Sequence, residues 1–155
     1  MRSDTLNVNS GKYGGRVDNV VFVVDAAAVN ISAADSGKTH VIPDLTADST
    51  FTLPTEEVGL NYEFWYGGTA ADAHDWIFKT TGNSNYFVGG LVGHDTDAGG
   101  DDTYVVDSNG SSNSQLTVYT PIAGTLVKVA CNGTVWYING QAISATDASH
   151  AFADQ

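Results

Sequence analysis

Short β-type runs follow one another along most of this 155-residue chain, and no segment keeps the apolar spacing of an amphipathic helix. Gly, Asn and Asp separate the runs, as is typical of strands joined by tight turns. The expected strands are 20–25, 39–42, 50–53, 62–66, 75–80, 86–92, 103–107, 115–119 and a closing hairpin of 126–131 and 134–139. Residues 26–34 have the best helical composition, but their β-branched residues favour an edge strand or a turn. The pattern predicts an all-β single domain: a β-sandwich, a jelly roll or a small barrel of short antiparallel strands.

The chain divides into a short arm and one β-domain. Residues 1–18 are polar and rich in glycine, without strand or helix period, so we expect a flexible N-terminal arm before a domain of residues 19–155. Leu6, Val8 and Tyr13 are the apolar side chains through which this arm could bind. There is no internal repeat of solenoid or propeller length.

The closing hairpin presents two different faces. Asn132-Gly133 between two β-type runs predicts a two-residue type I′ turn, which places Val129 opposite Trp136. One face then reads Val127, Val129, Cys131, Thr134, Trp136 and Ile138, and is a core face. The other reads Leu126, Lys128, Ala130, Val135, Tyr137 and Asn139. This second face is too apolar for a solvated surface and too polar for a second core, so it contacts either a partner or a covering loop of the same chain.

Residues 60–66 show the same alternation with an aromatic exception. Tyr62 and Phe64 share one face and are expected in the core, whereas Trp65 points to the opposite side. Trp65, Tyr66, His74 and Trp76 could form an aromatic platform for a sugar, because apolar sugar faces stack on aromatic rings. Packing in the core or in a subunit interface is the commoner use of such residues.

The charge of the chain and the length of its apolar runs argue against two classes of partner, nucleic acids and membranes. The formal net charge is −12, with six Lys and Arg against eighteen Asp and Glu, which argues against binding nucleic acid. The longest apolar run, 20–24, is too short to cross a bilayer, and the first residues lack the apolar core of a signal peptide, so we expect no membrane partner. The strands are nearly neutral, so assembly would use apolar strand faces.

No constellation of catalytic residues stands out, and we expect a protein that is not an enzyme. The four His are dispersed, and Glu56-Glu57 follows Pro54 in what we expect to be a solvated turn. The single Cys131 excludes an internal disulfide framework and is expected to be a small buried side chain. Residues 95–102 carry oxygen donors that suit calcium, but Gly99 and Val106 occupy two of the ligand positions of the EF-hand pattern. A solvated hairpin loop is the favoured interpretation, and no metal or cofactor is predicted.

Segments 45–54, 59–64, 73–76 and 132–137 together resemble a small β-module of structural proteins of tailed bacteriophages, particularly capsid decoration (cement) proteins. The resemblance covers about residues 39–140 and rests on strand and turn signatures. It implies a non-enzymatic homotrimer, made in the host cytoplasm, that sits on the outer capsid surface of the virion. There it would contact the major capsid protein and stabilise the shell by bridging neighbouring capsomers.

Seven residues are the candidates for these contacts: Leu6, Val8 and Tyr13 in the arm, and Trp65, Leu126, Val135 and Tyr137 on the strands. The alternative is a receptor- or carbohydrate-binding domain of a phage fibre or tail protein. That alternative predicts that Trp65 and Trp76 are exposed together on one surface.

Overall fold

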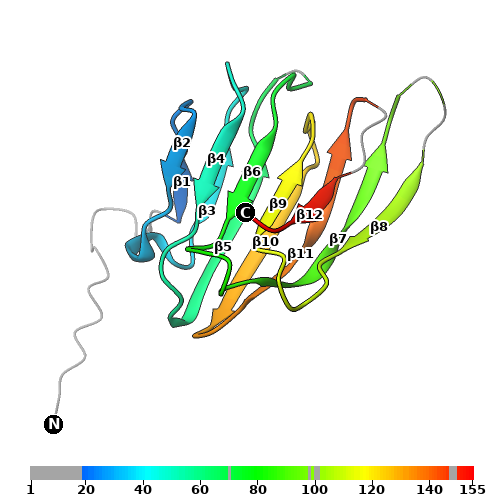
Figure 1. Cartoon of the computed structure of the whole chain (residues 1–155). Helices are drawn as coiled ribbons and strands as arrows, with labels where there is room; N and C mark the ends of the chain where they lie inside the picture. Colours follow the sequence, from blue (N-terminus) through cyan, green and yellow to red (C-terminus); the bar gives the residue numbers. More distant parts are fainter. Residues whose placement is uncertain (1–18, 70, 98, 100–101, 147–149) are drawn as a thin grey trace, which may run out of the picture.

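The computed structural model describes residues 19–69, 71–97, 99, 102–146 and 150–155 and shows a sandwich of two mixed β-sheets (Figure 1). The seven-stranded sheet runs in the order β1 (Val20–Phe22), β3 (Thr39–Ile42), β5 (Val58–Tyr66), β10 (Leu126–Asn132), β11 (Trp136–Ser144), β7 (Phe87–Asp95), β8 (Thr103–Asp107). The five-stranded sheet runs in the order β12 (Ala151–Ala153), β9 (Gln115–Val118), β6 (Trp76–Lys79), β4 (Ser49–Thr52), β2 (Ala28–Asn30). The predicted all-β sandwich is confirmed.

Every strand expected from the sequence is present. The ambiguous segment 26–34 forms the edge strand β2 and then one short 3-10 helix, η1 (Ala33–Asp35), which Ser32 caps by accepting a hydrogen bond from the amide of Ala34. The C-terminal strand β12 was not expected. Its three residues have partly buried side chains and pair antiparallel with β9.

The first six strands alternate between the two sheets. The chain passes from β1 to β2, back to β3 and so on, and within each sheet the successive strands pair in parallel. This part of the chain therefore winds as a flattened spiral through both layers. Five of the ten strand pairings among the described residues are parallel, so the prediction of antiparallel strands holds for only half of the pairings. A connection that runs through the opposite sheet brings the chain back in its original direction, which a tight hairpin cannot do.

The spiral has one open end. β1 and β2 are the outermost strands of the two sheets and lie on the same side of the molecule (Figure 1). No strand within the described ranges pairs with their outer edges. At the other end of the spiral, antiparallel pairing of β10 with β5 and of β9 with β6 continues both sheets.

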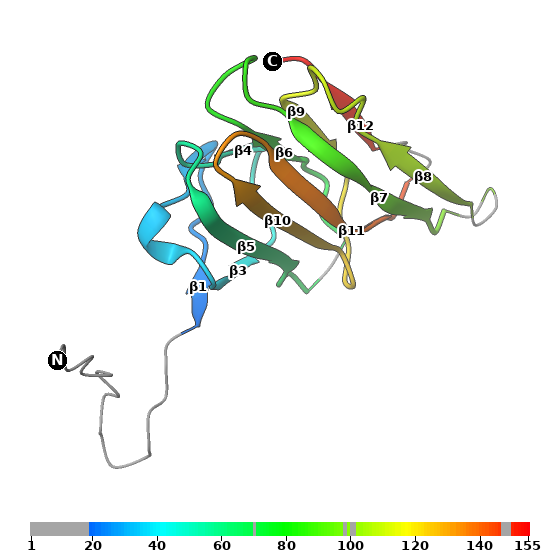
Figure 2. The same cartoon turned by 90° about the horizontal axis from the view of Figure 1, so that it is seen from below.

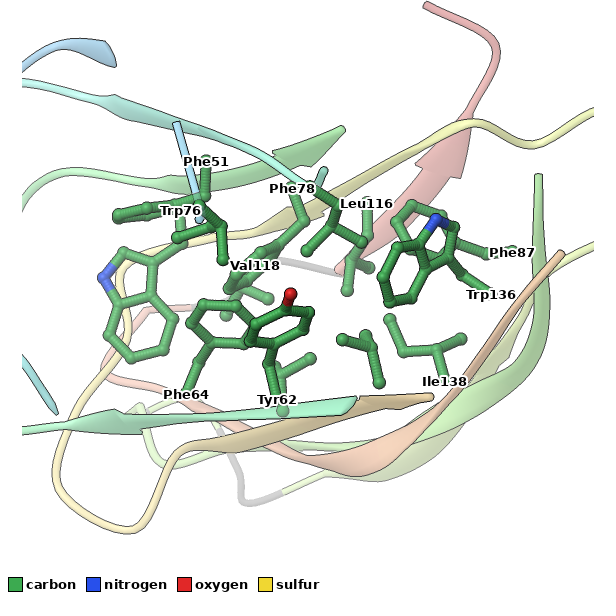
Figure 3. Close-up of a cluster of buried hydrophobic side chains, with 14 of the residues drawn as sticks. Phe51, Tyr62, Phe64, Trp76, Phe78, Phe87, Leu116, Val118, Trp136 and Ile138 are labelled. Atoms are coloured by element: carbon green, nitrogen blue, oxygen red, sulfur yellow. The ribbon is translucent and has the colours of Figure 1, made fainter. Parts of the chain in front are cut away.

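Aromatic side chains from both sheets fill the space between the layers (Figure 3). Phe64 of β5 lies fully buried with its ring centroid 4.8 Å from that of Phe78, and Phe78 lies 5.3 Å from Phe51 of the neighbouring strand. Tyr62 is 1% exposed and donates a hydrogen bond to the carbonyl oxygen of Ser32 at 3.2 Å. Burial raises the pKa of Tyr62 to about 12. The predicted core positions of Tyr62 and Phe64 are confirmed.

The closing hairpin differs from its predicted register. Cys131 pairs with Trp136, which leaves four residues in the turn, and Asn132 keeps a negative φ. Its side-chain oxygen accepts hydrogen bonds from the backbone amides of Thr134 and Val135, both at 3.0 Å. These bonds stabilise an Asx turn, so the prediction of a two-residue type I′ turn is wrong.

The assignment of residues 126–131 and 136–139 to the two faces of the hairpin is unaffected by this difference. The observed register differs from the predicted one by two residues, and side chains alternate with a period of two. Val127, Val129, Cys131, Trp136 and Ile138 are buried as expected. For two residues of the turn, the predicted burial is wrong. Thr134 is exposed. Val135, an interface candidate on the outer face, is only 8% exposed, although it is not part of the main hydrophobic core cluster.

His150 connects the C-terminal strand region to the rest of the core in its neutral form. Its Nδ1 accepts a hydrogen bond from the backbone amide of Tyr119 at 3.1 Å, so its Nε2 carries the proton and donates to the carbonyl oxygen of Ala142 at 3.0 Å. Burial lowers the pKa of His150 below its ordinary value of 6.5.

Acidification is therefore expected to destabilise the fold through His150. Just below pH 6.5 the unfolded chain binds a proton at this imidazole that the folded chain does not, so the free energy of unfolding falls as the pH decreases. Urea denaturation of the wild type and of His150→Gln, between neutral pH and about pH 5, measures this effect. The variant should show the flatter pH dependence, and an equal slope in both proteins would contradict the assignment.

Candidate interaction surface

The outer face of the seven-stranded sheet carries an apolar row that crosses all its strands. Directly paired residues connect it from β1 to β8, because residues opposite one another in neighbouring strands point to the same side. We call this set the apolar row; in order across the sheet it consists of Phe22, Val41, Trp65, Leu126, Gln141, Val92 and Val105. Figure 2 shows the sheet extending from β1 at one end to β8 at the other.

Most side chains of the apolar row are open to solvent, whereas Val41 and Leu126 are half-buried. Phe22 is 79% exposed, Val105 67%, Trp65 47% and Val92 45%. None of the seven members is charged, although the chain as a whole is strongly acidic. Scattered apolar residues are ordinary on a protein surface, but six of them in one line, interrupted by the uncharged Gln141 alone, are typical of an interaction site.

A polar row lies beside the apolar row on the same face. Glu63, Lys128 and Asn139 are paired across the three central strands, and Lys128 Nζ lies 2.7 Å from Glu63 Oε1. The Trp65 indole donates a hydrogen bond to the second carboxylate oxygen of Glu63 at 3.1 Å. The hydrogen bond from Lys128 holds the pKa of Glu63 below its usual value of 4.5. The two charges compensate one another, so the centre of this face is close to neutral.

A hollow of about 250 Å³ opens over these central strands. Asn61, Glu63, Lys128, Tyr137 and Asn139 contribute side chains to its lining. Tyr137 is 49% exposed, and its hydroxyl oxygen accepts a hydrogen bond from the Asn132 side chain at 3.3 Å. The hollow therefore combines an exposed aromatic ring with amide and charged groups.

The structure brings together three of the predicted contact residues. Trp65 and Leu126 are neighbours in the apolar row, and Tyr137 lies on the same face across the polar row. Val135 is separated from them by its burial, as described above. Leu6, Val8 and Tyr13 lie outside the described residues.

The sequence did not identify the other members of the apolar row. Phe22, Val92 and Val105 sit in strands with regular alternation, which shows that each points away from its buried neighbours but not that they lie in line. Their alignment depends on the pairing of strands that are distant in the sequence.

The aromatic platform considered for a sugar is not assembled as expected. Trp76 is fully buried, and its ring lies 6.0 Å from that of Tyr66 on the core side of the sandwich. Trp65 points to the outer face instead. Trp65 and Trp76 are thus not exposed together, contrary to what the carbohydrate-binding alternative predicted.

Glu56 is a structural acceptor, not the solvated residue that we expected in this turn. Its carboxylate accepts hydrogen bonds from the Trp136 indole at 2.9 Å, from the Asn85 amide at 2.6 Å and from the Thr81 hydroxyl at 3.0 Å. The carboxylate thereby connects three segments at one end of the sandwich.

The part of the chain that the structure describes contains no group of three or more His, Cys, Asp or Glu residues that could hold a metal ion. Of the segment considered for calcium, residues 98, 100 and 101 lie outside the described residues. Asp95 at its start is 4% exposed and accepts a hydrogen bond from the backbone amide of Asp97 at 2.8 Å.

No protein-family model matches the chain, and no curated protein matches it. Within the described ranges, no helix has the length and apolar character needed to cross a membrane. The surface of the seven-stranded sheet is therefore the basis for assigning a function.

Proposed function

We propose that this chain is a non-enzymatic decoration protein of the outer capsid of a tailed bacteriophage, and that it works as a homotrimer bridging neighbouring capsomers. The apolar row is the observation that carries the proposal. The resemblance of the strand and turn segments to decoration proteins supports the phage context, and the apolar row supports assembly.

The apolar row suits contact between copies of an acidic protein. The centre of a protein interface is usually depleted of charge and enriched in aromatic and aliphatic side chains, as the apolar row is. Two chains that each carry a net charge of −12 repel one another over most of their surfaces. On this face the repulsion is smallest, because the row is uncharged and Lys128 compensates Glu63.

In this proposal, the row packs between subunits, and residues 5–13 of each arm contact the major capsid protein. A trimer would then place three arms on one shell. Each arm contact can be weak. Once one arm of the trimer has bound, the other two arms are held at a high effective concentration near the shell, so the overall affinity rises steeply with the number of arms.

Introducing a charge into the apolar row is expected to prevent assembly. Val105→Glu and Trp65→Glu each place a carboxylate in the contact, and loss of such a residue typically costs about 2 kcal/mol, or about thirtyfold in affinity. Light scattering measures the mass of the assembly, and co-sedimentation with empty phage shells measures binding.

Thr55→Glu is the matched control. Thr55 is exposed and lies between β4 and β5, so the substitution adds the same charge outside the apolar row. It should leave both the mass and the shell binding unchanged. A wild-type protein that remains a 16.3 kDa monomer and does not bind shells would contradict the proposal.

A carbohydrate-binding domain of a fibre or tail protein is the second candidate. The hollow beside Tyr137 favours it, because an exposed aromatic ring with nearby amides is the combination that sugars stack on and hydrogen-bond to. Glycan-array binding that is lost in Tyr137→Ala but kept in Phe22→Ser would support this second function over the first.

A further inference from the structure

A second hollow lies at the open end of the spiral, where β1 and β2 face one another across the two sheets. Its volume is about 160 Å³, and most of its lining is apolar. The lining includes Val21, Phe22, Val23, Val29, Ile31 and His40. Phe22 and the neighbouring Val24 are 79% and 68% exposed, so apolar surface continues from the hollow to the outside.

His40 places an unpaired polar atom in this apolar wall. The side chain is 2% exposed, and its Nδ1 is buried without a hydrogen-bond partner among the described residues. The rings of Tyr62 and Phe64 pack against the imidazole, with centroids 5.7 and 5.1 Å away. The backbone of Lys38 and Glu63 also lies close to the imidazole, but no hydrogen bond of good geometry forms at Nδ1. A buried nitrogen in this state can still pair with a hydroxyl group that enters the hollow.

The topology indicates where the missing group comes from. In the spiral each strand is followed by one in the opposite sheet, so the segment before β1 is expected beside β2. Both outer edges are available, since no described strand pairs with them. An uncovered end of a stacked β-structure is usually closed by a further element of the chain.

The charges of the two parts of the chain are complementary. Residues 1–18 contain three of the six cationic side chains, Arg2, Lys12 and Arg16, against two acidic ones, Asp4 and Asp18. The remaining residues therefore carry three cations and sixteen acidic groups. The N-terminal segment has a net charge of +1 and the β-domain a net charge of −13. Asp35, which lines the hollow, is already paired with Lys38 at 2.6 Å, so the complementarity is one of overall charge.

We propose that residues 5–13 dock into this hollow on their own chain in the free protein, with Tyr13 inserted beside His40. Leu6, Val8 and Tyr13 supply apolar surface, and of these three only Tyr13 also carries a hydrogen-bonding group for the imidazole. The chain is fixed close by, because the carbonyl oxygen of Asn19 accepts a hydrogen bond from the amide of Thr39 at 2.8 Å. Six residues of extended chain span about 20 Å, which is enough to return to the hollow.

Docking on the same chain is favoured over docking on a neighbour, since the short connection gives the segment a high effective concentration at the hollow. The inference goes beyond the proposed function and holds whether or not the chain binds a shell. If the arm does contact a capsid, that contact competes with the docked state. The hollow then sets how readily the arm is released.

Methyl NMR on the full-length chain tests the docking directly. Nuclear Overhauser contacts are expected between the Tyr13 ring and the methyl groups of Val29 and Ile31, at intensities independent of protein concentration. Tyr13→Ser should abolish these contacts and shift both methyl signals. Ser10→Ala, a change in the same segment that removes no apolar surface, should leave both methyl signals unchanged.

Tyr13→Phe separates the ring from its hydroxyl. It should keep the methyl contacts but shift the Nδ1 nitrogen resonance of His40, because the hydrogen bond is lost. Identical methyl spectra in the wild type and Tyr13→Ser would overturn the proposal. Contacts that appear only between differently labelled copies would overturn it as well, since they would place the arm on a second chain.

Discussion

Phe64→Ala is expected to lower the free energy of unfolding by about 3–5 kcal/mol, as truncation of a fully buried phenylalanine usually does. Phe64 is fully buried in the centre of the sandwich, between side chains of both sheets. Its ring centroid lies 4.8 Å from that of Phe78 and 5.1 Å from that of His40. Removing the ring leaves a cavity that the surrounding β-sheets are too rigid to fill. Urea denaturation followed by circular dichroism measures the loss.

Trp65→Ala is the matched control, because Trp65 is the next residue of the same strand and points to the outer face. This change removes a larger side chain but leaves no cavity. We expect a loss below about 1 kcal/mol. Equal losses in the two variants would contradict the assignment of the two faces of β5.

Gly140→Ala is expected to destabilise the fold by about 3 kcal/mol, since overpacking adds to backbone strain. Gly140 lies in β11 opposite Val127 and has a φ of +151°, a region that other residues rarely adopt. A Cβ at this position would overlap the carbonyl oxygen of Leu126. β10 cannot move away, because β5 is paired with its other edge. Thermal and urea denaturation of the purified variant give the measurement.

Gly82→Ala controls for the loss of a glycine in general. A Cβ at Gly82 would meet no atom within 4 Å, and its φ is not in the left-handed region. The free energy of unfolding should remain unchanged or rise slightly, as expected when the unfolded chain loses conformational freedom. If Gly140→Ala were as stable as this control, the close approach of β10 and β11 would be wrong.

Local alternation explains why the strands could be predicted from the sequence. In residues 60–66 the side chains change sides at every step, so Tyr62 and Phe64 were assigned to the core and Trp65 to the outside without any knowledge of the fold. The same alternation identified Leu126 and Tyr137 as outward-facing. These properties depend only on neighbours within one strand.

Strand pairing and burial depth could not be predicted from local alternation, because both depend on segments that are distant in the sequence. Trp65 and Trp76 both sit in short aromatic runs, yet β6 lies in the middle of its sheet and buries Trp76 completely. The apolar row links Phe22 to Val105 through pairings between distant segments, which no local pattern encodes. At Asn132 the sequence Asn-Gly favoured one turn, but the Asn side chain stabilised another by binding two backbone amides.

The alternation of the first six strands between the layers has a consequence for folding. Because consecutive strands belong to opposite sheets, neither layer is formed from a continuous piece of chain, and neither can assemble or separate by itself. Each parallel pair also requires a full circuit of the chain to close before its hydrogen bonds form, which slows folding in topologies rich in distant contacts. Loss of one layer releases the strands of the other, so this half of the molecule is expected to unfold in a single cooperative step.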